Sequence, residues 1–135
     1  MPGKCFVDTN VVIYSLGTDP KAELAAALLA TRPVISTQVL AETANISLRK
    51  LAMPASEALR LVTWLTAVCN VEVVSPQTVA EAFRIVERYG FSWFDSLIVA
   101  AALQADCDVL LSEDMHHSQV IDSRLHITNP WVSKR

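Results

Sequence analysis

Four carboxylates stand at positions where an α/β chain would bring them together on folding. Asp8 directly follows the short apolar run 5–7, and Asp114 follows a later run of the same kind. Glu42 and Asp95 lie in stretches with the composition of helices. Oxygen ligands without histidine or thiolate favour Mg²⁺ or Mn²⁺ over zinc. The pattern therefore predicts a metal site whose bound water attacks a phosphodiester bond.

Each of these carboxylates also has an ordinary structural explanation. Asp8 suits the cap of a following helix, and Asp95 stands three residues after Ser92, which is the spacing of a capping box. Glu42 suits a solvated helix face, and Asp114 suits a turn after a strand. Like charges in close proximity raise each other's pKa, and a divalent cation removes that cost. The metal hypothesis therefore depends on all four residues together.

Short apolar segments alternate with helical segments along the chain. We expect strands at 5–7, 34–35, 71–74, 108–112 and, at an edge, 125–127. We expect helices at 11–14, 21–30, 37–51, 56–69, 76–89 and 92–105. This alternation implies right-handed crossovers and a parallel sheet with helices on both faces. Ligands bind beyond the carboxyl ends of such strands, where Asp8 and Asp114 lie side by side if the first and fourth strands are neighbours.

Helical spacing predicts which faces of two helices are buried. In the helix at 37–51, the expected core stripe consists of Leu40, Ala44, Leu48 and Leu51. In the helix at 76–89, the apolar positions that fit one face are Val79, Ala82, Phe83 and Val86.

The composition indicates one globular domain over residues 1–135. Hydrophobic residues make up 52% and charged residues 19%, and the net charge is −3. A domain that binds nucleic acid by overall charge is usually basic, so if this domain acts on nucleic acid, the contact has to be local or the positive charge has to come from a metal. The three cysteines lie far apart and predict neither zinc nor disulfides. Because the chain also lacks a signal-peptide pattern and an apolar run of membrane-spanning length, we expect a cytoplasmic protein without membrane contact.

Four weak motifs occur in a fixed order, at 6–11, 36–42, 94–102 and 110–115. Together they resemble the PIN domain family, specifically the VapC-type toxins of type II toxin–antitoxin systems. The resemblance implies a three-layer α/β/α domain with a central parallel sheet of four to five strands in the order 3-2-1-4-5. It also implies a Mg²⁺- or Mn²⁺-dependent endoribonuclease that forms a homodimer, and a cognate antitoxin whose tail covers the active-site groove.

By position, the family's acidic quartet corresponds to Asp8, Glu42, Asp95 and Asp114. The resemblance implies that Asp8, Asp95 and Asp114 bind the metal directly and that Glu42 acts through water or on a second ion. The supporting polar residues are Thr9, Asn10 and Ser112. Glu113 is expected to point away from the site, and it would replace Asp114 if the loop were shifted.

Several other residues have both a functional and an ordinary interpretation. His116 and His117 are candidates for contact with substrate or metal, but adjacent histidines in a loop are more often exposed to solvent. Trp93, beside Asp95, is the best aromatic candidate to line the groove and stack on bases. The candidates for RNA phosphate contacts are Arg49, Lys50, Arg84 and Arg88, with a solvated helix face or ion pairs to Glu81 and Glu87 as the alternative.

Three other functions compete with the toxin hypothesis. The first is a PIN-domain nuclease of RNA processing that has no antitoxin. The second is a phosphatase similar to the haloacid dehalogenase class, with Asp8 as nucleophile. That class requires an aspartate where this chain has Asn10 and a downstream lysine, and no lysine lies between Lys50 and Lys134. The third is a binding module without catalytic activity.

Overall fold

The computed structural model describes residues 3–132, which are built around a six-stranded sheet. The strands are β1 (Cys5–Val7), β2 (Val34–Ser36), β3 (Asn70–Glu72), β4 (Val109–Leu111), β5 (Val120–Ile121) and β6 (Leu125–Thr128). Their order is β3-β2-β1-β4-β6-β5, and every neighbouring pair is parallel except β5 with β6. The predicted order 3-2-1-4-5 is confirmed, because the fifth strand expected at 125–127 is β6.

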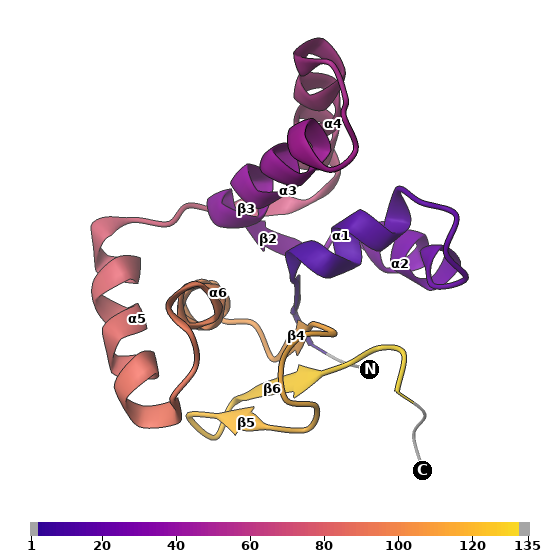
Figure 1. The fold of residues 1–135 in the computed structure, drawn as a ribbon. Coiled ribbons are helices and arrows are strands. Elements are labelled where there is room, and N and C mark those ends of the chain that lie inside the picture. Colours follow the sequence, from indigo (N-terminus) through magenta and orange to yellow (C-terminus); the bar gives the residue numbers. More distant parts are fainter. Residues whose placement is uncertain (1–2, 133–135) are drawn as a thin grey trace.

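Six helices cover the sheet within the described residues. They are α1 (Thr9–Ser15), α2 (Ala22–Leu29), α3 (Thr37–Arg49), α4 (Ala55–Val68), α5 (Pro76–Tyr89) and α6 (Trp93–Gln104). Figure 1 shows α1 and α2 on one side of the sheet and α5 and α6 on the other. The hairpin of α3 and α4 extends from the end of the sheet that carries β2 and β3 (Figure 1). The predicted three-layer α/β/α arrangement is therefore confirmed.

The two-residue strand β5 was not predicted. Val120 pairs with His126 and Ile121 pairs with Leu125, so β5 forms an antiparallel edge on β6. Two residues are too few to show an alternating pattern, and the turn between the strands contains no glycine. The pairing therefore left no recognisable signal in the sequence.

The core surrounds the central strands and includes side chains of α1, α2 and the apolar helix α6. Phe6, Val7 and Leu110 are completely buried in β1 and β4. All residues of α6 from Ser96 to Leu103 are buried, because this helix is covered by the sheet on one side and by α5 on another. Although α6 is apolar all round, neither it nor any other helix within residues 3–132 is long and apolar enough to cross a membrane.

For two helices, α3 and α5, the predicted buried face differs in part from the face that is buried in the structure. In α3 the buried residues are Val39, Thr43 and Ser47, whereas Leu48 is 46% exposed and Leu51, which lies beyond the end of the helix, is 45% exposed. Periodicity of apolar residues misses this face because two of its members are small polar residues. In α5 the buried residues are Thr78, Ala82 and Ile85, while Phe83 is 64% exposed.

Capping residues fix where the helices near the site begin and end. The Ser36 hydroxyl accepts from the Val39 N–H and starts α3, which sets the position of Glu42 one turn later. Helix α5 begins with a capping box and ends at Gly90, whose φ of 77° lies in the left-handed region.

Candidate active site

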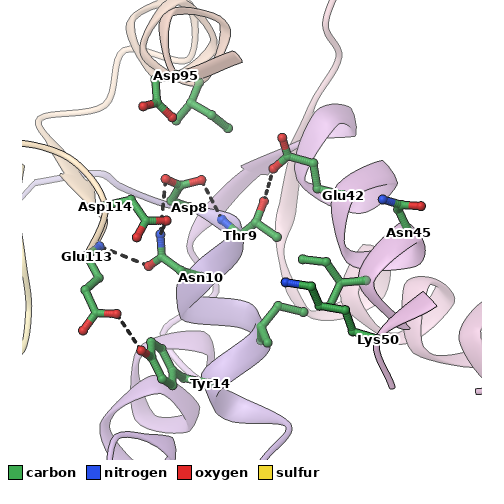
Figure 2. A pocket seen from close by; sticks show the side chains of 13 residues that line it. Asp8, Thr9, Asn10, Tyr14, Glu42, Asn45, Lys50, Asp95, Glu113 and Asp114 are labelled. Carbon is green, nitrogen blue, oxygen red and sulfur yellow. Dashed lines mark hydrogen bonds between the residues drawn. The ribbon is translucent and has the colours of Figure 1, made fainter. Parts of the chain in front are cut away.

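Asp8 is held at the carboxyl end of β1 by backbone pairing with β4. Val7 is in register with Leu111, and the Asp8 N–H donates to the Leu111 carbonyl at 3.0 Å. The Asp8 carboxylate then accepts from the Thr9 N–H at 2.7 Å, which makes Asp8 the N-cap of α1. The ordinary interpretation of Asp8 as a cap is therefore correct. It does not exclude a functional role, because the same side chain also faces a cavity (Figure 2).

A hydrogen-bond network connects Asp8 with the loop that follows β4. The Ser112 hydroxyl donates to Asp8 Oδ2 at 2.8 Å and accepts from the Asp114 N–H at 3.2 Å. The Asn10 amide donates to Asp114 Oδ2 at 3.1 Å and lies 3.4 Å from Asp8 Oδ2. Asn10 Oδ1 accepts from the Glu113 N–H at 3.1 Å. These bonds hold Asp8 and Asp114 at the same edge of the sheet, as the sequence predicted.

Glu42 reaches the same region from α3. The Thr9 hydroxyl donates to its Oε1, and the Gln38 amide donates to its Oε2 at 2.9 Å. The Gln38 amide also donates to the Phe94 carbonyl at 3.1 Å, just before Asp95. Gln38 therefore ties α3 to the start of α6 and fixes the orientation of Glu42.

Asp95 lies in the first turn of α6. The Ser92 hydroxyl accepts from the Asp95 N–H at 3.2 Å and caps the helix. A carboxylate in the first turn is favoured by the helix dipole, so this position is also structurally sound. Figure 2 shows Asp95 reaching from α6 toward the side of the cavity occupied by Asp8 and Asp114.

All four predicted carboxylates line one open cavity of about 550 Å³. They come from four separate segments: the loop after β1, helix α3, helix α6 and the loop after β4 (Figure 2). The lining residues are Asp8, Thr9, Asn10, Ile13, Tyr14, Glu42, Asn45, Ile46, Lys50, Asp95, Ile98, Glu113 and Asp114. The cavity is strongly acidic, because five of these side chains are carboxylic acids and one, Lys50, is basic.

The protonation behaviour of the site reflects buried, uncompensated charge. Burial raises the pKa of Asp8 to about 6, although the bonds from Ser112 and Thr9 oppose this shift. The nearby carboxylates of Glu42 and Asp95 raise the Asp8 pKa further. The pKa of Asp95 is also raised, first by burial and then by Asp114 and Glu42. A cation among these groups would reverse all of these effects.

The donor chemistry of the cavity fits a hard divalent cation. The available ligands are carboxylate, amide and hydroxyl oxygens, which Mg²⁺ and Mn²⁺ prefer. Within residues 3–132, no three acidic, histidine or cysteine side chains stand close enough together to hold one ion among them. Mg²⁺ usually keeps several waters and binds through one or two carboxylates, so the observed spacing suits an ion that is partly held through water.

Glu113 and Asp114 point in different directions. The Glu113 carboxylate accepts from the Tyr14 hydroxyl at 2.6 Å and forms an ion pair with Lys21. The Lys21 ammonium lies 4.9 Å from the centre of the Tyr14 ring and 5.4 Å from that of Trp131. Glu113 therefore anchors the loop after β4 to α1 and the segment before α2, and it leaves Asp114 to face Asp8 and Asn10.

The histidines and Trp93 lie outside the cavity. His116 is exposed, and His117 Nδ1 accepts from the Asn129 N–H at 2.9 Å. Trp93 does not line the groove as expected, because its ring packs against Phe83 with 4.8 Å between the ring centres. Gln38, which hydrogen-bonds to Glu42, was not predicted as a site residue. Its position four residues before Glu42 on a helix was the signal that could have identified it.

Comparisons with known proteins agree with this architecture. A model of the family described as PIN domain matches residues 5–122. Similar structures include a toxin–antitoxin complex from Klebsiella pneumoniae, with 17% identity, a TM-score of 0.73 and coverage of 95% of this chain and 98% of that one. Another is VapBC bound to DNA from Salmonella typhimurium, with 21% identity, a TM-score of 0.67 and coverage of 92% and 97%.

A third similar structure is VapC20 from Mycobacterium tuberculosis, described as a toxin that cleaves the sarcin–ricin loop. It has 22% identity, a TM-score of 0.63 and coverage of 82% of this chain and 92% of that one. At these identities the likeness establishes the fold. No curated protein sequence matches the chain significantly.

Proposed function

The chain belongs to the PIN domain family, and from this premise we propose that it is a metal-dependent endoribonuclease that acts as the toxin of a toxin–antitoxin pair. The observation that carries the proposal is the convergence of Asp8, Glu42, Asp95 and Asp114 on one cavity. These residues are separated by up to 106 positions in the chain, and the raised pKa values of Asp8 and Asp95 mean that these two charges cost stability where they stand. Such an arrangement is typical of a functional site.

In this proposal Asp8, Asp95 and Asp114 would hold Mg²⁺ or Mn²⁺ with part of the contact made through bound water, and Glu42 would act through water or on a second ion. When bound, the metal supplies an activated water and neutralises charge on the phosphodiester. The protein's own groups supply orientation. Ser112 and Asn10 keep Asp8 and Asp114 facing each other, while Thr9 and Gln38 hold Glu42. Removal of such supporting contacts typically lowers metal affinity or activity by about 10- to 100-fold.

We infer that the partners are an RNA substrate, a cognate antitoxin and a second copy of the chain. The similar structures from Klebsiella pneumoniae and Salmonella typhimurium are complexes of a toxin with its antitoxin, which supports an antitoxin here. The surface of α3 and α4 exposes Leu48, Leu51, Leu59 and Trp64. Exposed apolar side chains in one region are typical of interfaces.

Two of the competing functions are disfavoured by the site. A phosphatase of the haloacid dehalogenase class needs a second aspartate where Asn10 stands, and Asn10 instead donates to Asp114. A binding module without catalytic activity has no need to keep four mutually repelling carboxylates. A nuclease of RNA processing uses the same site, so only the partner protein distinguishes it from a toxin.

The decisive experiment compares two adjacent acids. Purified protein is incubated with RNA and Mg²⁺ or Mn²⁺, alongside Asp114→Asn and Glu113→Gln. We expect Asp114→Asn to lose cleavage by at least about 100-fold, because it removes a proposed ligand. Glu113→Gln should keep most of its activity and lose about 1 kcal/mol of stability with its ion pair.

Two further results would test the site as a whole. Chelation by EDTA should stop cleavage, and Glu57→Gln, at an exposed acid that does not line the cavity, should have no effect. Equal cleavage by wild type, Asp8→Asn and Asp114→Asn would remove the acidic site from the mechanism. Absence of metal-dependent cleavage of any RNA by the wild type would refute the nuclease proposal.

A further inference from the structure

We propose that Lys50 is a substrate-binding residue that holds an RNA phosphate adjoining the one that is cleaved. This inference rests on the proposed function and deepens it, because it assigns a second contact region within the same cavity. Lys50 is the residue that follows the last residue of α3 and serves as its C-cap. It lines the same cavity as the four carboxylates.

Lys50 differs from the other charged residues of the cavity lining by its positive charge. Five acidic side chains and this single basic one line the cavity within the described residues. RNA is a polyanion, and an acidic cavity repels it unless positive charge is supplied. A metal would supply that charge near Asp8. Lys50 is the one lining residue that can supply it from the protein, at a separate point along the cavity.

The ammonium of Lys50 is also free to bind a ligand. Within residues 3–132, three other cations are committed to carboxylates: Lys21 to Glu113, Arg84 to Glu81 and Asp122, and Arg124 to Asp106. Lys50 has neither an ion pair nor a hydrogen bond through its ammonium in this part of the chain. Glu42, the acid that shares its helix and its cavity, is instead bonded by Thr9 and Gln38.

The position of Lys50 favours a neighbouring phosphate over the cleaved one. Figure 2 shows its side chain reaching from the end of α3 toward Thr9. In the same view Asp114 lies beside Asp8, and Asp95 lies beyond Asp8 from Lys50. The cleaved phosphate has to lie beside the proposed metal ligands. Lys50 therefore contacts the RNA strand at another nucleotide. Ile13 and Ile46 form apolar lining of the same cavity.

An ordinary structural role for Lys50 makes a different prediction. A cation at the end of a helix interacts favourably with the helix dipole, which is a small contribution to stability at an exposed site. Loss of that role would shift the unfolding temperature slightly and leave RNA binding unchanged. A phosphate contact would instead change the dependence of RNA affinity on salt, because each contact releases condensed counterions.

The test measures RNA binding in an Asp114→Asn background, in which cleavage is silenced and the altered side chain is exposed. The probe is a fluorescein-labelled, mixed-sequence single-stranded RNA of twelve nucleotides, because phosphate contacts do not depend on sequence. Anisotropy gives Kd over a series of NaCl concentrations at one fixed Mg²⁺ concentration. Adding Lys50→Gln should weaken binding roughly three- to tenfold and reduce the slope of log K against log salt by about 0.7.

Arg49→Gln is the matched control. Arg49 is the adjacent cation at the end of α3, it is exposed and it does not line the cavity. We expect Arg49→Gln to leave the slope unchanged and Lys50→Arg to restore it. An unchanged slope in Lys50→Gln, or an equal change in Arg49→Gln, would overturn the assignment of Lys50.

These failures are distinct from failure of the proposed function. The assignment alone is overturned if the background variant binds RNA and Lys50→Gln binds it equally well, while the wild type cleaves RNA with Mg²⁺. If the background variant binds no RNA and the wild type cleaves none, both the assignment and the proposed function are overturned.

Discussion

At Asp8, one carboxylate caps α1 and also faces the acidic cavity. The side chain is 6% exposed, and its bonds to Ser112 and Thr9 do not offset the cost of burying its charge. Its folded pKa of about 6 therefore lies above the ordinary value of 3.8. A residue in this state lowers the stability of the metal-free protein at neutral pH.

The pH dependence of stability follows from this shift. Between pH 4 and 6 the folded protein binds more protons at Asp8 than the unfolded chain does. The contribution of Asp8 to stability is therefore most favourable below about pH 4 and falls by at most about 3 kcal/mol as the pH rises through about 6. In EDTA, we expect Asp8→Asn to be more stable than the wild type at pH 8, with a smaller difference at pH 5.

Urea denaturation of both proteins at the two pH values measures the effect. Asp95 has a raised pKa as well, so Asp8→Asn should keep part of the pH dependence. If wild type and Asp8→Asn lost stability in parallel between pH 5 and 8, burial of Asp8 would not be the cause.

At the scale of elements, α6 is the buried helix that places Asp95. Its middle is a run of small residues, Ala100, Ala101 and Ala102, all at most 1% exposed. Small side chains allow close packing of the helix against the sheet and α5, and they leave no room for larger ones.

Overpacking of α6 should therefore be costly. We expect Ala101→Leu to lower the free energy of unfolding by about 1–3 kcal/mol, because the added atoms force neighbours out of place. The same change at Ala80, exposed on α5, should alter it by less than about 0.5 kcal/mol. Chemical denaturation compares the two variants, and equal effects would mean that α6 is not packed as tightly as described.

The sequence predicted the elements that carry strong local signals. β1 ends at Val7 as predicted, because an apolar run gives way abruptly to polar residues. The start of α5 at Pro76 was also predicted, because proline suits the first position of a helix. The buried face of α3 was predicted wrongly. The spacing of apolar residues selected the face that carries Leu48, whereas the face that is buried carries the polar residue Thr43. The contacts between side chains across the cavity depend on tertiary packing. Local sequence patterns do not contain that information.

At the candidate site, the prediction succeeded for residues tied to strand ends. Asp8 and Asp114 were placed together because parallel strands present their carboxyl ends at one edge of the sheet. Trp93 was wrongly assigned to the groove, because adjacency to Asp95 in sequence does not determine which way a helical side chain points. The metal roles of the acidic residues remain predictions.

The whole molecule combines an acidic cavity at one edge of the sheet with exposed apolar side chains on α3 and α4. The net charge of −3 gives no general attraction to RNA. Binding of a divalent cation should therefore be the event that makes the cavity receptive to a polyanion. It should also stabilise the fold, because a ligand that binds only the folded state shifts the unfolding equilibrium.

Thermal unfolding can measure this stabilisation. At Mn²⁺ concentrations about 100 times Kd, we expect a gain of about 2.7 kcal/mol and a rise in Tm of roughly 8 °C. Asp95→Asn should show a much smaller rise and Glu57→Gln an undiminished one. A rise of equal size in all three proteins would indicate that Mn²⁺ binds somewhere other than the acidic cavity.

The acidic cavity is assembled from segments that are far apart in the chain, and β4 lies between β1 and β6. A polypeptide still leaving the ribosome presents Asp8 and Glu42 long before Asp114. Its β4 cannot join β1 until residues 109–111 have emerged, well after Glu42. A nuclease of the proposed kind would therefore lack its complete acidic cavity during the earlier part of its own synthesis.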